Sequence, residues 1–280
     1  MFGAFTSFGK LGALASSVAR AWSPSALWPT GTEPGMWIDP SNLVSQWRDS
    51  TGTTPVAPPG TVADSSNPVG LALDIRAGAT ALADPGNHML QATSTARPLL
   101  SAYDGQTLGP GDTYDAAGYP VFQLYDGVDD GMATAAFPAG TLTAGMDCLI
   151  AVRRDSAAAC VAGLIGSPGG TKYFGLTVPV IGYDTFSSCG TPTCLVDGTA
   201  LTGAATSDVL AAALTVGDWH ILEYRNLDLS AWESARFGDY SGFLFPGGRG
   251  DILLYPSTAS TEDKDAARQW LADYYGVTLP

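Results

Sequence analysis

Short apolar runs separated by turn residues fill most of this chain. A clear example lies between Pro120 and Met132, where the apolar run 121–125 ends at Asp126-Gly127 and a second run begins after Gly131. β-Branched and aromatic residues favour strands, and Asp-Gly favours a tight turn, so this stretch predicts a strand, a turn and the start of another strand. The same pattern recurs downstream, and it predicts an all-β fold, an antiparallel β-sandwich.

Two further pairs of runs extend this pattern. Residues 148–152 and 160–165 are apolar runs of strand length separated by the polar residues 153–156, which predicts a β-hairpin. Residues 71–75 and 219–224 also have the composition of strands.

The C-terminal segment carries the clearest helical pattern. Ser260 with Asp263 three residues later resembles a capping box, and Gly276 is a typical helix stop. Four apolar residues recur at helical spacing on one face: Ala267, Trp270, Leu271 and Tyr274. We therefore expect a C-terminal helix that packs Trp270 against the sandwich.

The first 35 residues differ from the rest. Apolar side chains recur about every three residues, at Phe2, Phe5, Phe8, Leu11, Leu14 and Val18. This spacing suits an amphipathic helix, which the interspersed glycines weaken, and no uninterrupted apolar run is long enough to span a membrane. We expect this segment to dock on a partner; the alternative is that it packs on its own domain.

A connector rich in Pro, Ser and Thr follows, from Trp22 to Pro34. Such a composition favours an extended, semi-rigid spacer. We therefore divide the chain into an N-terminal anchor and linker, residues 1–35, and a sandwich domain, residues 36–280.

Charge narrows the classes of partner. The chain has 27 acidic and 13 basic residues, a net charge of −14, and only 14% charged residues. A strongly negative surface repels nucleic acid and anionic lipid, so neither nucleic-acid binding nor membrane insertion is expected. Most of the acidic residues are aspartates near turns, where a short carboxylate caps the backbone.

Candidate catalytic groups are few. The chain has two histidines, His88 and His220; His220 lies in an expected strand, and a turn-stabilising role suits His88. Glu223 is the single carboxylate of its run, so the alternating acids that line the cleft of many glycosidases are missing. We expect a protein that is not an enzyme and has no required cofactor.

The cluster Asp126, Asp129 and Asp130 has two interpretations. Tight-turn geometry explains it, and it also offers the oxygen ligands that calcium prefers.

The four cysteines likewise leave alternatives open. Cys189 and Cys194 are close enough in sequence to form a disulfide, and the alternative is that both stay free thiols. Cys148 and Cys160 are expected as buried free thiols.

A series of short motifs resembles a known module. They are residues 36–41, 49–56, 68–71, 86–88, 91–92, 96–98 and 125–130, followed by the Trp219-His220 strand and a last strand at 250–255. Together they resemble the laminin-G-like, concanavalin A-like jelly-roll modules of tailed-phage and prophage virion proteins, over about residues 36–280. One departure is the Ala-rich insert at 77–85, which ends in Asp84-Pro85.

The resemblance implies a jelly-roll sandwich in a virion protein that is assembled in the host cytoplasm and contacts other virion proteins through its N-terminal segment. Fibres and spikes are often trimers, so a homotrimer is one oligomeric state that the resemblance implies. Modules of this kind often bind carbohydrate, and some hold calcium. Loop aromatics that would suit a sugar site are Tyr103, Tyr114, Tyr119, Tyr183 and Phe186. The expected function is particle docking through Phe2, Phe5, Phe8, Leu11 and Leu14, with host-glycan attachment by the sandwich. The alternatives are a purely architectural capsid or tail decoration or fibre protein and, last, a glycan-degrading enzyme.

Overall fold

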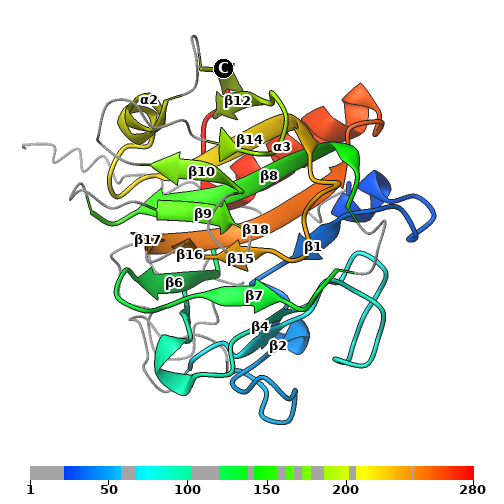
Figure 1. The fold of residues 1–280 in the computed structure, drawn as a ribbon, viewed down its shortest axis with the longest axis vertical. Coiled ribbons are helices and arrows are strands. Elements are labelled where there is room, and N and C mark those ends of the chain that lie inside the picture. The colour runs from blue at the N-terminus through cyan, green and yellow to red at the C-terminus, as the bar shows by residue number, and fades with distance from the viewer. Residues whose placement is uncertain are drawn as a thin grey trace, which may run out of the picture.

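Two antiparallel β-sheets face each other and form a sandwich, as the apolar runs predict (Figure 1). The computed structural model describes residues 22–57, 67–102, 120–137, 142–156, 162–166, 172–177, 186–201, 206–240 and 243–280. The all-β fold class is therefore confirmed, and the strands take up the short runs between turns because Gly, Asp and Pro interrupt every longer apolar stretch.

The first sheet contains the longest strands. In spatial order they are β13 (Thr199–Ala200), β12 (Thr193–Val196), β14 (Trp219–Asp228), β8 (Ala144–Arg154), β18 (Pro246–Pro256), β6 (Phe122–Asp126) and β5 (Leu99–Ser101). β1 (Met36–Ile38) pairs with the second half of β18, with Trp37 opposite Leu253. β14, β8 and β18 form the centre of the sheet, so the predicted strands at 219–224 and 250–255 are confirmed.

The second sheet is built from shorter strands. In spatial order they are β11 (Phe186–Ser187), β10 (Tyr173–Thr177), β9 (Ala162–Gly166), β15 (Arg236–Phe237), β7 (Met132–Thr134), β4 (Met89–Leu90), β3 (Leu71–Ala72) and β2 (Gln46–Trp47). β16 (Asp239–Tyr240) and β17 (Phe243–Leu244) form a separate two-stranded ribbon. Short 3-10 helices lie at Leu43–Ser45 and Ser94–Ala96.

The main core lies between the sheets. On β8, Cys148, Ile150 and Val152 belong to this core, whereas the intervening Leu149 and Ala151 belong to a second cluster on the outer side of the sheet. This alternation is the period of two of a strand buried on both faces. The central strands are therefore continuous apolar runs.

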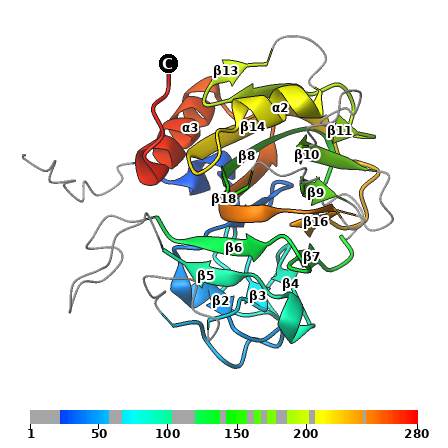
Figure 2. The ribbon, with the colours of Figure 1, turned by 90° about the vertical axis from the view of Figure 1, so that its left-hand side faces the viewer.

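Helix α3 (Thr261–Tyr275) covers the outer face of the first sheet (Figure 2). Its N-cap Ser260 accepts a hydrogen bond from Asp263 N at 3.1 Å, and Gly276 ends it with a φ of 70°. Trp270 is 8% exposed and contacts Trp37 edge to face. The predicted capping, helix stop and packing of Trp270 are all confirmed.

The connector between Trp22 and Pro34 is not the extended spacer that its composition predicts. Residues Pro24–Leu27 form a 3-10 helix, η1, and Leu27 and Trp28 are each 2% exposed beneath α3. Trp22 Nε1 donates to Asp263 Oδ1 at 3.2 Å. The large apolar residues of the connector outweigh its Pro and Ser content, so the sandwich unit extends back to Trp22.

The predicted hairpin of residues 148–152 with 160–165 is wrong. β8 pairs with β14 and β18 in the first sheet, whereas β9 pairs with β10 and β15 in the second. Strand composition does not reveal which neighbour a strand pairs with, and two consecutive runs on opposite sheets leave the same sequence pattern as a hairpin. The chain crosses between sheets at this point, as it also does between β6 and β7.

A second helix, α2 (Ser207–Ala213), has no counterpart among the sequence predictions. Its C-terminal carbonyl groups face a buried cation, because Arg154 Nη1 donates to Ala211 O and Leu214 O. In the part of the chain that the structure describes, no helix is long and apolar enough to cross a lipid bilayer.

Candidate functional site

The loop that enters β4 is organised around a buried carboxylate. Asp74 is fully buried; its Oδ1 accepts from Trp37 N at 3.0 Å, and its Oδ2 accepts from Asn87 N at 2.9 Å. Arg76 Nε lies 3.1 Å from the same Oδ2. Asn87 Nδ2 donates to Gly35 O at 2.7 Å, which ties the loop to the segment before β1. These bonds fix the backbone and the amide of Asn87 in one position.

His88 is held by two hydrogen bonds. Asp74 N donates to its Nδ1 at 3.0 Å, and its Nε2 lies 2.9 Å from Asp84 O. Because Nδ1 accepts the hydrogen bond from Asp74 N, it carries no hydrogen, and Nε2 carries the hydrogen that it donates to Asp84 O. Both nitrogens of His88 are occupied within the loop, which confirms the turn-stabilising role predicted for it and leaves neither nitrogen free to act as a base.

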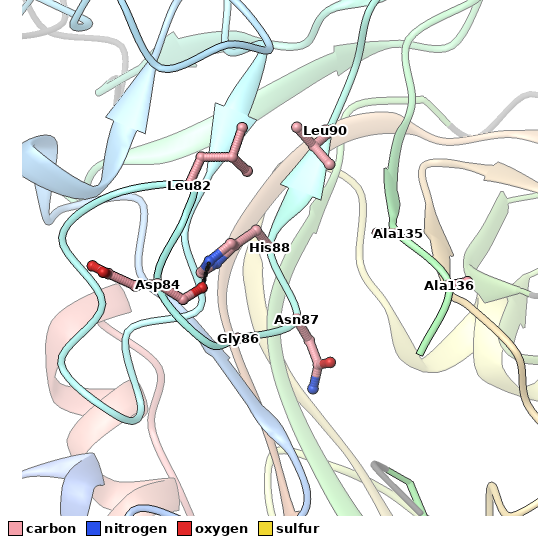
Figure 3. Close-up of a pocket in the computed structure, with 8 residues that line it drawn as sticks. All are labelled: Leu82, Asp84, Gly86, Asn87, His88, Leu90, Ala135 and Ala136. Carbon is pink, nitrogen blue, oxygen red and sulfur yellow. Dashed lines mark hydrogen bonds between the residues drawn. The ribbon is translucent and has the colours of Figure 1, made fainter. Parts of the chain in front are cut away.

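A pocket of about 170 Å³ opens beside this loop (Figure 3). It is lined by Leu82, Asp84, Gly86, Asn87, His88, Leu90, Ala135 and Ala136. Met89 belongs to the core between the sheets, so its neighbour Leu90 faces the outer side of the second sheet, where it packs near Leu71 and Leu73. The pocket therefore lies on the outer face of that sheet.

The polar atoms that line the pocket differ in whether they are free to bind a ligand. The Asp84 carboxylate is turned away from the other lining residues in Figure 3 and accepts hydrogen bonds from Thr80 N at 2.7 Å and Ala81 N at 2.9 Å. Asn87 is only 4% exposed, and no described residue donates to its Oδ1. The bond from Nδ2 to Gly35 O fixes which end of the amide is oxygen. The pocket thus offers apolar walls and one preorganised acceptor.

The acidic turn after β6 brings its three carboxylates together, each offering an oxygen within 4.8 Å of the others. Turn hydrogen bonds occupy two of them. Asp126 Oδ1 accepts from Val128 N at 2.7 Å, and Asp130 Oδ2 accepts from Asp126 N at 2.8 Å. The turn interpretation therefore accounts for Asp126 and Asp130 without a metal.

Burial, together with the negative charges of Asp126 and Asp129, raises the pKa of Asp130 to about 7, and the hydrogen bond from Asp126 N opposes this shift. Calcium takes six to eight oxygen ligands, and these three carboxylates supply part of such a set. Calcium binding by Asp126, Asp129 and Asp130 stays a prediction.

His220 and Asp197 are arranged like the Asp–His pair of a catalytic triad. On β14, Nδ1 of His220 lies 2.7 Å from Asp197 Oδ2, while Ile221 N donates to Asp197 Oδ1 at 2.7 Å. His220 Nε2 is buried and has no partner among the described residues, so no serine or cysteine of those residues completes the triad. Asp197 and Gly198, with φ of 51° and 79°, form the two-residue turn of the β12–β13 hairpin. The turn explains the position of Asp197.

Glu223 is buried in an ionic contact and is not open to a substrate. Arg268 Nε of α3 lies 2.7 Å from its Oε2, and Arg225 contacts its Oε1 at 2.5 Å. The pocket beside His88 contains one carboxylate, Asp84. The pair of open carboxylates that glycoside hydrolysis requires is thus not found at either place.

The described cysteines are free thiols and do not form the disulfide that the sequence allowed. Cys148, Cys189 and Cys194 are free and buried, so the structure does not contain the disulfide between Cys189 and Cys194. Cys189 Sγ faces Tyr173 O at 3.7 Å, whereas Cys194 has the Tyr224 side chain as its partner. Burial raises the pKa of both thiols to about 12. Cys160 lies outside the described residues.

Several predicted functional residues lie outside the described ranges. They are the docking residues Phe2, Phe5, Phe8, Leu11 and Leu14 and the loop aromatics Tyr103, Tyr114, Tyr119 and Tyr183. Phe186 begins β11 and is partly buried against the main core. Among the described residues, the large exposed hydrophobics are Val44, Leu82, Val128, Val209 and Val216, none of them aromatic.

The sequence analysis did not identify the pocket beside Asn87. A signal was present, because the Ala-rich insert at 77–85 is the point where the chain departs from the expected module, and Leu82 and Asp84 of that insert form one wall. The free acceptor of Asn87 has no sequence signal, since it depends on the contact of Nδ2 with Gly35, 52 residues earlier.

No protein-family model matches this chain, and neither a curated protein nor a solved structure matches it. The resemblance to laminin-G-like phage modules therefore stays a prediction that rests on the short motifs of the sequence.

Proposed function

We propose that this chain is a structural protein of a bacteriophage virion, which docks by its N-terminal segment and displays the sandwich toward the glycans of the host surface. The observation that carries the docking part is the attachment of residues 22–28 beneath α3. Leu27 and Trp28 are buried there, Trp28 stacks on Trp37 with ring centroids 6.4 Å apart, and Trp22 is bonded to Asp263.

Because residues 22–28 are held on the domain, the segment that precedes them is joined to it at a fixed position. An apolar segment that leaves a domain from a rigid site transmits the position of its partner to the whole domain, whereas a flexible spacer does not. The pattern Phe2, Phe5, Phe8, Leu11 and Leu14 supplies apolar area for burial in a partner. The acidic sandwich, at a net charge of −14 for the chain, stays soluble and repels nucleic acid.

The test is incorporation into particles. A variant lacking residues 2–21 keeps Trp22 and everything after it, so its thermal unfolding should match that of the full chain while its incorporation into virions is lost. The triple substitution F2S/F5S/F8S should have the same effect, and K10A serves as the matched control that leaves the apolar pattern intact. Normal incorporation of the deletion variant would refute docking by this segment.

The glycan part is tested separately, by binding of the purified protein to host-surface polysaccharides with and without a calcium chelator. Specific binding that chelation abolishes would support both glycan attachment and a calcium role for Asp126, Asp129 and Asp130.

A purely architectural role is the second candidate, and it is favoured by one observation: the large exposed hydrophobics among the described residues include no aromatic for sugar stacking. Absence of binding to every polysaccharide would select that role.

A further inference from the structure

We infer that the pocket beside Asn87 binds the acetamido group of an N-acetylated sugar, an inference that rests on the proposed glycan contact. The size of the pocket is the first argument. At about 170 Å³ it is smaller than the roughly 300–1,000 Å³ typical of sites for whole small molecules. It is suited to one substituent of a larger ligand that otherwise stays in solvent.

The chemistry of the walls is the second argument. Leu82, Leu90, Ala135 and Ala136 supply apolar surface, and Asn87 Oδ1 belongs to a buried side chain and receives no hydrogen bond from a described residue. Both nitrogens of His88 are occupied, and the Asp84 carboxylate bonds to backbone N–H groups of its own loop. Because the Asp84 carboxylate is turned away from the other lining residues in Figure 3, a group that fits needs no positive charge, and it must carry one N–H or O–H donor next to an apolar part.

An acetamido group meets both conditions. Its methyl group packs on apolar walls, and its N–H donates to an amide oxygen. In Figure 3, Leu82 and Leu90 gather at one end of the pocket, Ala135 and Ala136 stand across from them, and the Asn87 amide lies at the other end. A plain hydroxyl would satisfy Asn87 but leave the apolar walls unused, so the pocket discriminates by the methyl group.

Preorganisation is the third argument. Asn87 is anchored at its backbone N–H by Asp74 and at its Nδ2 by Gly35. Gly86 has no space for a side chain, because a Cβ there would lie 2.6 Å from the His88 ring. The acceptor is thus held in place before any ligand arrives, which lowers the entropic cost of binding.

The experiment compares the methyl glycosides of N-acetylglucosamine and glucose by ligand-observed NMR titration of the full chain. We expect the acetylated sugar to bind at least about tenfold more tightly, a difference of about 1.4 kcal/mol. A136L should fill the pocket and abolish this binding without lowering the temperature of unfolding, because Ala136 is exposed. A200L, at the exposed edge strand β13, is the matched control and should bind like the wild type.

Equal binding of the two sugars, or unchanged binding by A136L, would overturn the acetamido assignment and leave glycan contact elsewhere on the sandwich intact. Absence of binding by either monosaccharide would overturn it as well. The polysaccharide experiment above then decides the proposed function independently, because it does not depend on this pocket.

Discussion

Short polar side chains stabilise the loops of this sandwich through hydrogen bonds within each loop. Asp49 accepts hydrogen bonds from the hydroxyl of Thr51 and from the backbone N–H groups of Thr53 and Thr54, and these bonds hold the pKa of its carboxyl well below the usual range. His88 and Asp126 act similarly in their own turns. These residues belong to the motifs behind the family resemblance, so the motifs report how the chain turns. They carry information about architecture rather than about a ligand.

Asp130 gives the first prediction at this scale. Its pKa is about 7 in the folded protein, above the value of about 3.9 for an unfolded chain. The folded state therefore binds more protons between those values, and stability falls as pH rises from about 4 to 7. D130N removes this titration but keeps an oxygen that accepts from Asp126 N.

We expect D130N to be more stable than the wild type at pH 8, because it no longer buries a charge beside two other carboxylates, and to show little difference at pH 4. Chemical denaturation across this pH range measures both curves. Parallel curves for the two proteins would show that the Asp130 carboxyl ionises equally readily in the folded and unfolded chains. D155N, on a partly exposed aspartate paired with Arg153, is the matched control.

At the scale of elements, α3 fastens the outer face of the first sheet. Apolar contacts of Ala267, Trp270 and Leu271 cover the centre, and two ionic contacts flank them: Arg268 with Glu223, and Lys264 Nζ with Asp147 Oδ2 at 2.8 Å. Near its end, the Tyr275 hydroxyl donates to Asp251 Oδ2 at 2.9 Å and lies where a Cβ on Gly250 would be. The helix thus contacts all three central strands of the sheet beneath it, β8 through Asp147, β14 through Glu223 and β18 through Asp251.

The two arginines on Glu223 provide a paired prediction. The side chain of Arg268 is 12% exposed, whereas that of Arg225 is 41% exposed, and Glu223 itself is fully buried. R268A should lower the free energy of unfolding by about 3 kcal/mol, since it removes two hydrogen bonds to a buried carboxylate. R225A should cost less than about 1 kcal/mol, because solvent screens an exposed pair.

Urea denaturation of R268A and R225A measures the difference. Similar losses for the two variants would mean that Glu223 relies equally on both partners. The double variant R268A/E223Q tests the cause: it should recover part of the loss, because a neutral side chain costs less to bury than an unpaired carboxylate.

How far the sequence predicts these elements depends on where their signals lie. α3 is predictable because its cap, apolar face and stop fall within 17 residues, from Ser260 to Gly276. The pairing of β8 is not, because Cys148 faces Tyr224 on one side and Leu254 on the other, far away in sequence. The pocket beside Asn87 belongs to the second kind, since Leu82 and Ala136 come together through the sheet.

The whole molecule is a closed sandwich with polar groups buried between its sheets. Arg249 on β18 is 1% exposed, lies over the rings of Tyr125 and Phe237, and bonds to Gln123 Oε1, while its Nε has no partner among the described residues. Burial lowers the pKa of this guanidinium. A cation enclosed in this way reaches solvent only if the two sheets separate.

The accessibility of the cysteine thiols measures the same separation of the two sheets. Cys148, Cys189 and Cys194 are each at most 2% exposed, and burial raises the pKa of all three. Alkylation needs an accessible thiolate, so in a C160S variant, which removes the fourth cysteine, these thiols should stay unmodified by N-ethylmaleimide at neutral pH until the sandwich unfolds.

Mass spectrometry of intact C160S protein follows this reaction. We expect no adduct in native buffer and three in guanidinium, with the three labels appearing together as denaturant is raised, because the thiols share one core. A native mass lighter by two hydrogens and a single label in guanidinium would instead show a disulfide between two of them. Rapid labelling of Cys189 alone in native buffer would show that the β10–β11 edge opens independently, which would separate the stability of the second sheet's edge from that of the central strands β8, β14 and β18.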